Sequence, residues 1–207
     1  MKFRKFINER SRLPVEEIVK ILKKDCGPFL KEMKFVKKFM WRGLGISIAD
    51  IKKVAVRRER HPSDMPHWLH KLLDEVFKDN FGWKVRSNSA FAFGSRTPSL
   101  RYGRPYLFFP IGKYEYIWSP TIKDLYYRLV HSWGWGPKGI SLPQDDLTED
   151  WIEENIIEEY LESNLVEVIK NRLFNEVMFN CKKYYLVNDD YEEGTTFEPP
   201  LADLLWK

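Results

Sequence analysis

Three segments of this chain have the composition of β-strands, and patterns typical of amphipathic helices lie between them. Residues 84–93 alternate in side-chain character. Residues 106–118 are rich in aromatic and β-branched residues and are interrupted by Pro110 and Gly112, and residues 179–187 have a similar composition. Strands and helices mixed along one chain predict an α+β domain.

The first of these segments places hydroxyl groups beside aromatic rings. Side chains alternate across a strand, so Val85, Ser87, Ser89, Phe91 and Phe93 would share one side. Residues 84–93 are therefore predicted to form one strand with serines on its aromatic face.

Helical periodicity is clear near the N-terminus. Apolar residues recur at helical spacing within residues 13–24, from a start near Pro14, and a second short helix is expected over residues 29–39. Residues 1–40 are therefore expected to form a helical cap ahead of the core.

Further helices are expected downstream. Ser63 and Asp64 offer an N-cap for an amphipathic helix that ends near Gly82. Residues 145–162 interleave carboxylates with Ile, Leu and Trp, which is typical of exposed amphipathic helices. Residues 189–207 begin with acidic residues and are expected to pack on or flank the core.

Size and composition favour one compact domain. The chain has 207 residues, of which 43% are hydrophobic and 15% aromatic, and it contains no repeat or low-complexity linker. No segment approaches the roughly 18 apolar residues of a membrane span, and no signal peptide is evident. Cys26 and Cys181 lack redox or zinc spacing and are interpreted as reduced thiols. We expect a cytoplasmic monomer that contacts no membrane and binds no metal.

Charge is distributed unevenly along the chain. Residues 1–60 contain 18 Lys or Arg against 7 Asp or Glu, and the remainder is net acidic. A basic first third can attract nucleic acid or another polyanion, although solvated helix faces explain it equally simply. Arg57, Arg58 and Arg60 could contact phosphates or could form an exposed basic loop.

Two other patterns indicate no specific chemistry. Histidines within residues 61–70 include potential metal ligands, but nothing completes a four-ligand set. Gly134 and Gly136 match neither the GxGxxG spacing of a dinucleotide-binding fold nor a phosphate loop.

Two short motifs about 130 residues apart combine residue types suited to cleaving a bond between a sugar and a cationic base, such as the nicotinamide–ribose bond. Positive charge then spreads over the ribose, so a nearby carboxylate is the natural catalyst, and Glu176 opens a predicted strand that can hold it. Arg42 can clamp phosphate oxygens or ribose hydroxyls. Gly43 lets the backbone approach the nicotinamide amide.

Supporting roles fall to the serine strand and nearby aromatic residues. Ser87 and Ser89 can hold the arginine or the glutamate in place. Phe91 or Tyr102 can stack on the cationic nicotinamide ring.

In chain order, these motifs resemble three sequence blocks of the ADP-ribosyltransferase family, which includes bacterial toxins and the poly(ADP-ribose) polymerases. Residues 40–43 resemble the first block, and the arginine there is similar to the Arg-Ser-Glu branch of toxins and phage enzymes. Residues 89–93 and 99–102 resemble the second block. Residues 173–179 and 184–187 resemble the third, which carries the catalytic glutamate.

The resemblance covers roughly residues 38–188 and implies a catalytic core over residues 41–188. Its fold would be a split β-sheet, with two small, mostly antiparallel sheets forming a cleft covered by the N-terminal helices. The residues it assigns to NAD are Arg42, Gly43, Ser87, Ser89, Phe91, Tyr102 and Glu176, of which Glu176, Arg42 and Ser89 form the catalytic set.

The implied activity is transfer of single ADP-ribose units from NAD, used as a substrate, to a macromolecule. A protein is the favoured acceptor, in the host cytoplasm if the protein is phage-encoded. Two alternatives remain: a transferase directed at nucleic acid, and a non-catalytic binding or inhibitor protein on the same fold.

Overall fold

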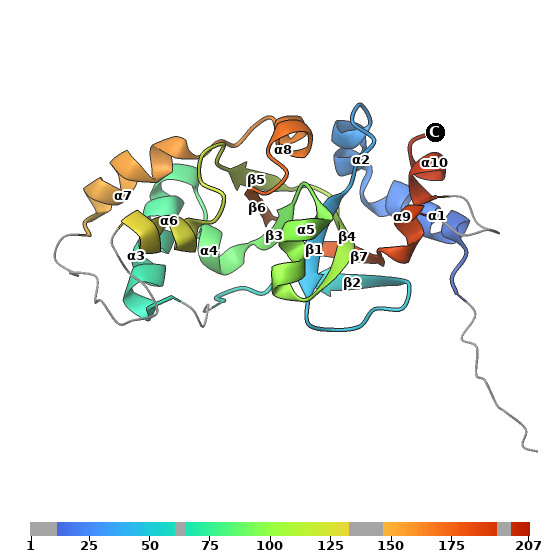
Figure 1. Ribbon diagram of the computed structural model, residues 1–207, viewed down its shortest axis with the longest axis horizontal. Coiled ribbons are helices and arrows are strands. Elements are labelled where there is room, and N and C mark those ends of the chain that lie inside the picture. The colour runs from blue at the N-terminus through green and yellow to red at the C-terminus, as the bar shows by residue number, and fades with distance from the viewer. Residues whose placement is uncertain (1–11, 61–64, 133–146, 194–199) are drawn as a thin grey trace, which may run out of the picture.

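A computed structural model describes residues 12–60, 65–132, 147–193 and 200–207 (Figure 1). Within these residues, seven strands form one antiparallel sheet in the order β2-β7-β4-β1-β3-β6-β5. Helices surround this sheet, which confirms the expected α+β class. The strands are β1 (Met40–Leu44), β2 (Ile51–Ala55), β3 (Ala90–Phe93), β4 (Arg104–Pro110), β5 (Glu115–Trp118), β6 (Glu176–Asn180) and β7 (Lys183–Asn188).

The sheet has two halves that meet at a narrow junction. Strands β1 and β4 pair along their length, from Met40↔Phe108 to Leu44↔Arg104. Strands β1 and β3, in contrast, pair only at Trp41↔Phe93. The expectation of two separate sheets is therefore wrong, because this one pair continues the ladder from one half to the other.

The helices pack on both faces of the sheet and at its ends (Figure 1). Those before the fourth strand are α1 (Val15–Asp25), α2 (Gly27–Met33), α3 (His67–Phe81), α4 (Val85–Asn88), α5 (Arg96–Ser99) and the 3-10 turn η1 (Leu100–Tyr102). Those after the fifth strand are α6 (Leu125–Ser132), α7 (Glu149–Asn155), the 3-10 turn η3 (Ile157–Glu159), α8 (Leu165–Asn171), α9 (Asp190–Glu193) and α10 (Leu201–Leu205).

Alternation along β6 separates two hydrophobic cores. Val177 and Phe179 belong to a core that also contains buried residues of α1, α2, α8 and α10. Met178 points to the other face, into a core formed with α3, α6 and α7. Glu176 is two residues before Met178 and so shares the face of the second core.

The segment at residues 84–93 differs from its predicted form. Residues Val85–Asn88 form helix α4, and only Ala90–Phe93 form a strand. The cause is Asp74 of α3, whose Oδ1 accepts the backbone N–H groups of Arg86 at 2.8 Å and of Ser87 at 3.1 Å. These bonds satisfy backbone donors that a strand would give to its neighbour, so the apparent alternation includes one helical turn.

The other helix predictions were mostly confirmed. Helix α1 matches its expected range, but α2 begins at Gly27 and ends at Met33 instead of continuing to residue 39. Helix α3 begins at His67 after Pro66, and it ends as expected at Gly82, whose φ of 81° closes the helix. Ser63 and Asp64, proposed as its N-cap, lie outside the described residues.

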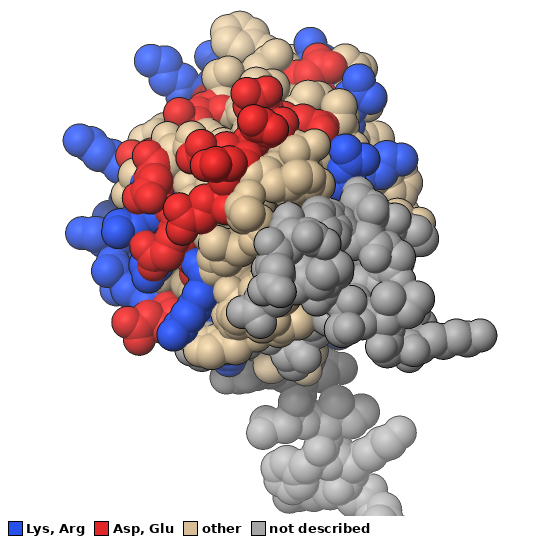
Figure 2. All heavy atoms as spheres, turned by 90° about the vertical axis from the view of Figure 1, so that its left-hand side faces the viewer, with Lys and Arg blue, Asp and Glu red and all other residues tan. Residues whose placement is uncertain are grey.

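The acidic segment forms amphipathic helix α7 and turn η3. Ile152 and Ile157 are buried in the second core, while carboxylates point outward. Acidic side chains accordingly gather on the face that carries these elements (Figure 2). Near the C-terminus, Tyr191 and Trp206 are buried against the sheet and the N-terminal helices. Within the described ranges, no helix combines the length and apolar character needed to cross a membrane.

Gly103 supports the turn between η1 and β4 and provides a test of the packing there. Its φ is 118°, and a Cβ at this position would lie 2.5 Å from the carbonyl carbon of Leu44. Gly112 also has a positive φ, of 70°, but a Cβ there would meet nothing within 4 Å.

We expect Gly103→Ala to lower the free energy of unfolding by about 3 kcal/mol or more, because backbone strain adds to a clash with backbone atoms. Gly112→Ala is the matched control and should cost only about 1 kcal/mol, from strain alone. Urea unfolding of both variants measures the difference. Equal losses would show that the Gly103–Leu44 contact is not tight.

Candidate active site

One cavity of about 410 Å³ brings together residues from both halves of the sheet. It lies where β1, β3 and β6 meet and is bordered by η1 and by the segment after β2. Of the residues predicted from sequence, all but Ser87 line it, namely Arg42, Gly43, Ser89, Phe91, Tyr102 and Glu176. Helices α1 and α2 contribute no lining residue, so the expectation that the N-terminal helices cover this cleft is wrong: they pack into the first core instead.

Glu176 lines this cavity and has contacts on several sides. It pairs with Phe93 across β6 and β3, and its backbone N–H donates to the carbonyl of Lys123 at 3.0 Å. The Tyr102 hydroxyl donates to Oε1 at 3.2 Å. Nη1 of Arg86 lies 3.6 Å from Oε2. The carboxylate is thus fixed in position by a backbone strand, a phenol and a guanidinium.

The environment of Glu176 disfavours its ionised form. Only 7% of the residue is exposed. Burial raises the pKa of Glu176 to about 7, although the charges of Arg86 and Arg60 and the Tyr102 hydrogen bond act in the opposite direction. Asp124 adds to the increase. A carboxyl group with a pKa near neutrality in a cavity is a recognised sign of a functional site.

Arg42 lines the same cavity from β1, and part of its hydrogen-bonding capacity is unused. Its Nη1 donates to the carbonyl of Phe91 at 2.5 Å, and the guanidinium lies 5.3 Å from the ring centre of Tyr184. Its Nε is buried and has no hydrogen-bond partner among the described residues. A buried guanidinium N–H without an acceptor suits an oxygen-rich ligand.

Gly43 and Tyr102 are linked through packing. A Cβ on Gly43 would lie 1.9 Å from the carbonyl oxygen of Ser99. The glycine therefore allows α5 and η1 to lie directly on β1, and η1 carries Tyr102 to the cavity. The Tyr102 ring stacks on Phe93, with centroids 5.7 Å apart and planes at 22°. Burial raises the pKa of Tyr102 above its usual value, so its hydroxyl remains protonated and can donate a hydrogen bond.

The two serines have structural contacts instead of the orienting contacts predicted for them. The Ser87 hydroxyl donates to Asp74 and lies 2.9 Å from Nε2 of His70, within the second core and outside the cavity lining. The Ser89 hydroxyl lines the cavity but donates to the carbonyl of Val85. No described hydrogen bond joins either serine to Arg42 or Glu176. In and directly after α4, their hydroxyls bond instead to Asp74 and to the Val85 carbonyl.

Sequence reasoning missed Arg86, which the structure places beside Glu176. Arg86 is 8% exposed and lies on α4, with its guanidinium 5.0 Å from the ring centre of Phe91. The predicted strand had placed it on the side opposite the serines. The only sequence signal for its role was a basic residue next to the serines of this segment. The helical turn of α4 directs the Arg86 side chain to the Glu176 carboxylate.

Three further charged residues line this cavity. Arg57 and Arg60 line it, and the Arg60 guanidinium lies 4.9 Å from the Phe91 ring centre. Asp124 lines it as well, while its Oδ1 accepts the backbone N–H of Tyr127 at the start of α6. Four arginines therefore face two carboxylates, which leaves the cavity positively charged and suited to an anionic ligand.

Metal binding finds no support in the part of the chain that the structure describes, where no three His, Cys, Asp or Glu side chains are grouped to hold an ion. His61 and Asp64, and also Gly134 and Gly136, lie outside the described residues. Cys26 and Cys181 are buried free thiols, and burial raises the pKa of each to about 12.

Comparison with known proteins adds no relative to this description. No protein-family model, curated protein or solved structure matched the chain.

We expect the buried carboxyl group to make stability pH-dependent. The unfolded chain releases the Glu176 proton near pH 4.5, whereas the folded protein retains it up to about pH 7. Raising the pH from 5 to 8 should therefore withdraw on the order of 2 kcal/mol from the wild-type free energy of unfolding.

The measurement is urea unfolding at pH 5 and pH 8 for wild type and Glu176→Gln. The variant has no proton to release here, so its loss over this range should be smaller. Glu162→Gln, an exposed substitution, should behave as wild type. Identical pH dependence in wild type and Glu176→Gln would contradict the expected pKa.

Proposed function

We propose that this protein is an NAD-dependent ADP-ribosyltransferase that cleaves the nicotinamide–ribose bond and transfers ADP-ribose to a macromolecule. The observation that carries the proposal is that Arg42 and Glu176, from motifs distant in sequence, line one cavity together with Tyr102. The order of the three sequence blocks, which resemble those of the family, supports it further.

The charge of the cavity suits the proposed substrate. The side chains of Arg42, Arg57 and Arg60 offer guanidinium donors to a pyrophosphate. The unpartnered Nε of Arg42 is the donor most in need of an acceptor. Phe93 and Tyr102 provide stacked aromatic surface for a planar ring.

Glu176 would act on the ribose. Its ionised carboxylate stabilises the positive charge that develops on the sugar as nicotinamide leaves. Arg86 helps to keep this carboxylate charged, since its guanidinium lowers the pKa that burial raises. Nicotinamide leaves as a neutral molecule, so its departure requires no general acid. The Tyr102 hydroxyl donates a hydrogen bond to Glu176. When substrate binds, Tyr102 can exchange this hydrogen bond for a contact with the substrate.

The direct test is nicotinamide release from NAD by the purified protein. We expect Glu176→Gln to reduce kcat by at least 100-fold, because the charge opposite the developing cation is lost. Arg42→Ala should reduce kcat/KM by about 10-fold to 100-fold through loss of a positioning contact.

Matched controls are Glu162→Gln and Arg101→Ala, both at exposed positions outside the cavity lining. Each should retain activity within about twofold, and circular dichroism should confirm that all four variants fold. Release that is undiminished in Glu176→Gln, or absent from the wild-type protein, would refute the proposal.

We also expect a pH profile set by Glu176. Below its pKa of about 7, kcat/KM should rise about tenfold per pH unit and then level off, because the active form is the carboxylate. Arg86→Gln should move the inflection to higher pH, since the guanidinium lowers this pKa. Steady-state rates from pH 5.5 to 8.5 measure both. A flat wild-type profile would exclude an ionising Glu176 from the rate.

A further inference from the structure

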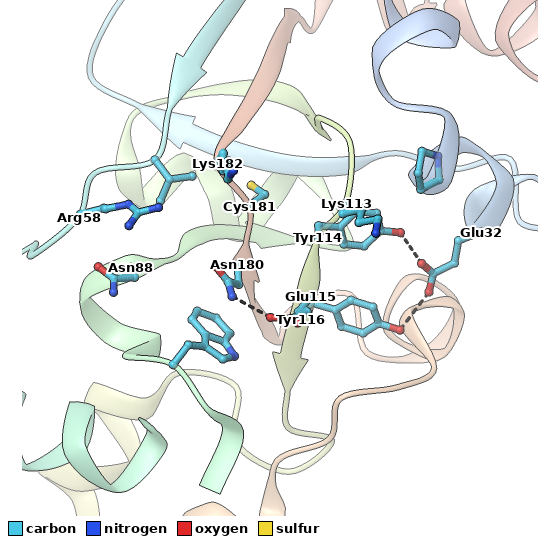
Figure 3. A pocket seen from close by; sticks show the side chains of 13 residues that line it. Glu32, Arg58, Asn88, Lys113, Tyr114, Glu115, Tyr116, Asn180, Cys181 and Lys182 are labelled. Carbon is cyan, nitrogen blue, oxygen red and sulfur yellow. Dashed lines mark hydrogen bonds between the residues drawn. The ribbon is translucent and has the colours of Figure 1, made fainter. Parts of the chain in front are cut away.

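A second cavity, of about 930 Å³, lies next to the first. Val56 lines both, and the consecutive arginines that follow divide between them: Arg57 lines the first and Arg58 the second. The second cavity is formed by α2, the segments around β5 and the β6–β7 turn, and the residues at either end of α4 (Figure 3). None of the residues assigned from sequence to the NAD site lines it, whereas Arg58, a possible phosphate contact, does.

The basic residues of this cavity are available to a ligand. Arg58, Lys113 and Lys182 line it, and within the described residues no salt bridge or side-chain hydrogen bond engages them. Arg58 and Lys182 lie toward one end in Figure 3, while Glu32 lies at the other. The carboxylate of Glu32 accepts the hydroxyls of both Tyr114 and Tyr116, the latter at 3.0 Å. The basic end is thus the part suited to an anion.

Aromatic and amide groups also line this cavity. Trp83, Tyr114 and Tyr116 line the cavity, and Trp83 is 8% exposed. Its indole Nε1 is buried without a hydrogen-bond partner in the described structure. Rings of this kind provide stacking surfaces for planar bases.

Two amides complete the set with opposite hydrogen-bonding capacities. Oδ1 of Asn88 accepts the backbone N–H of Glu59 at 3.2 Å, which leaves its amide N–H groups to donate. Nδ2 of Asn180 donates to Glu115 at 2.8 Å, which leaves its amide oxygen to accept. The edge of a nucleobase also presents donors and acceptors, so these two amides match it better than they match a carboxylate side chain.

We propose that this cavity binds a nucleotide within single-stranded nucleic acid, with phosphate at Arg58 and Lys182 and the base near Asn88, Asn180 and the aromatic residues. An acidic peptide would bind the basic side chains, but its carboxylates would make no use of the aromatic surfaces or of the paired amide donor and acceptor. Because Val56 lines both cavities, the bound strand lies next to the cavity that contains Glu176. Its role as the acceptor of ADP-ribose rests on the proposed transferase function, whereas its binding does not.

The test is fluorescence anisotropy without NAD, using fluorescein-labelled dodecamers of deoxythymidine and of uridine. We expect Arg58→Ala/Lys113→Ala/Lys182→Ala to weaken binding at least 10-fold at 100 mM salt and to reduce the slope of log K against log salt by about 2. The control triple variant, Lys24→Ala/Lys71→Ala/Lys170→Ala, removes equal charge from exposed positions outside both cavities and should lose less than threefold.

Competition identifies the ligand source. AMP should compete only at concentrations at least 100-fold above the dodecamer; competition at equal concentration would overturn the proposal in favour of a free nucleotide. Equal binding of polyglutamate, no binding of either dodecamer, or equal losses in the two triple variants would also overturn it.

Nicotinamide release separates this proposal from the transferase function. The Arg58/Lys113/Lys182 variant should retain wild-type nicotinamide release, because none of its substitutions touches the first cavity. Loss of release in this variant would contradict the assignment of separate cavities. Dodecamer binding by a protein that releases no nicotinamide would support the binding site while refuting the transferase.

Discussion

The pairing of Phe93 on both of its sides determines the geometry of the candidate site. Phe93 is opposite Trp41 of β1 and also opposite Glu176 of β6. Neighbouring strands lie about 4.8 Å apart, so these two pairs place the first and third sequence motifs on the two strands that flank β3. Among the described residues, Trp41↔Phe93 is the only pair that joins β1 to β3, and the cavity lies at this junction. The strand pairing that joins the two half-sheets therefore also assembles the site.

A second layer of contacts controls the charge at that junction. Asp74 accepts the backbone N–H groups of Arg86 and Ser87 and thereby forms the helical turn of α4. That turn directs the Arg86 guanidinium to within 3.6 Å of the Glu176 carboxylate. Burial favours the neutral acid while the guanidinium favours the anion, so the balance lies near neutral pH. Asp74 of α3 thus influences this carboxylate through the position of Arg86.

The segment after β2 gives the molecule a boundary between two cavities of different character. On one side, arginines and a buried carboxylate surround a space suited to an anionic ligand. On the other, aromatic rings, amides and basic side chains surround a larger space. In the functional interpretation proposed above, a donor and an acceptor occupy neighbouring sites. The acidic face formed by α7 and η3 belongs to a different part of the surface (Figure 2).

The sequence was informative wherever local spacing decides the structure. Helix α1, the end of α3 at Gly82 and the strand opened by Glu176 followed from periodicity and turn chemistry. The motifs at Arg42 and Glu176 also identified residues that share one cavity. Short motifs and their order can be recognised in a sequence without knowledge of the fold.

Contacts between distant segments decided the remainder. Asp74 converted half of a predicted strand into α4, removed Ser87 from the cavity and placed Arg86 beside Glu176. Periodicity does not reveal such contacts, since a two-residue alternation over four residues fits a helical turn as well as a strand. The second cavity likewise combines side chains from five separate segments, none of which carries a recognisable motif. The sequence alone therefore determined which chemical groups this protein carries, and the tertiary structure decided which of them meet, because their meeting depends on pairing and packing across long sequence separations.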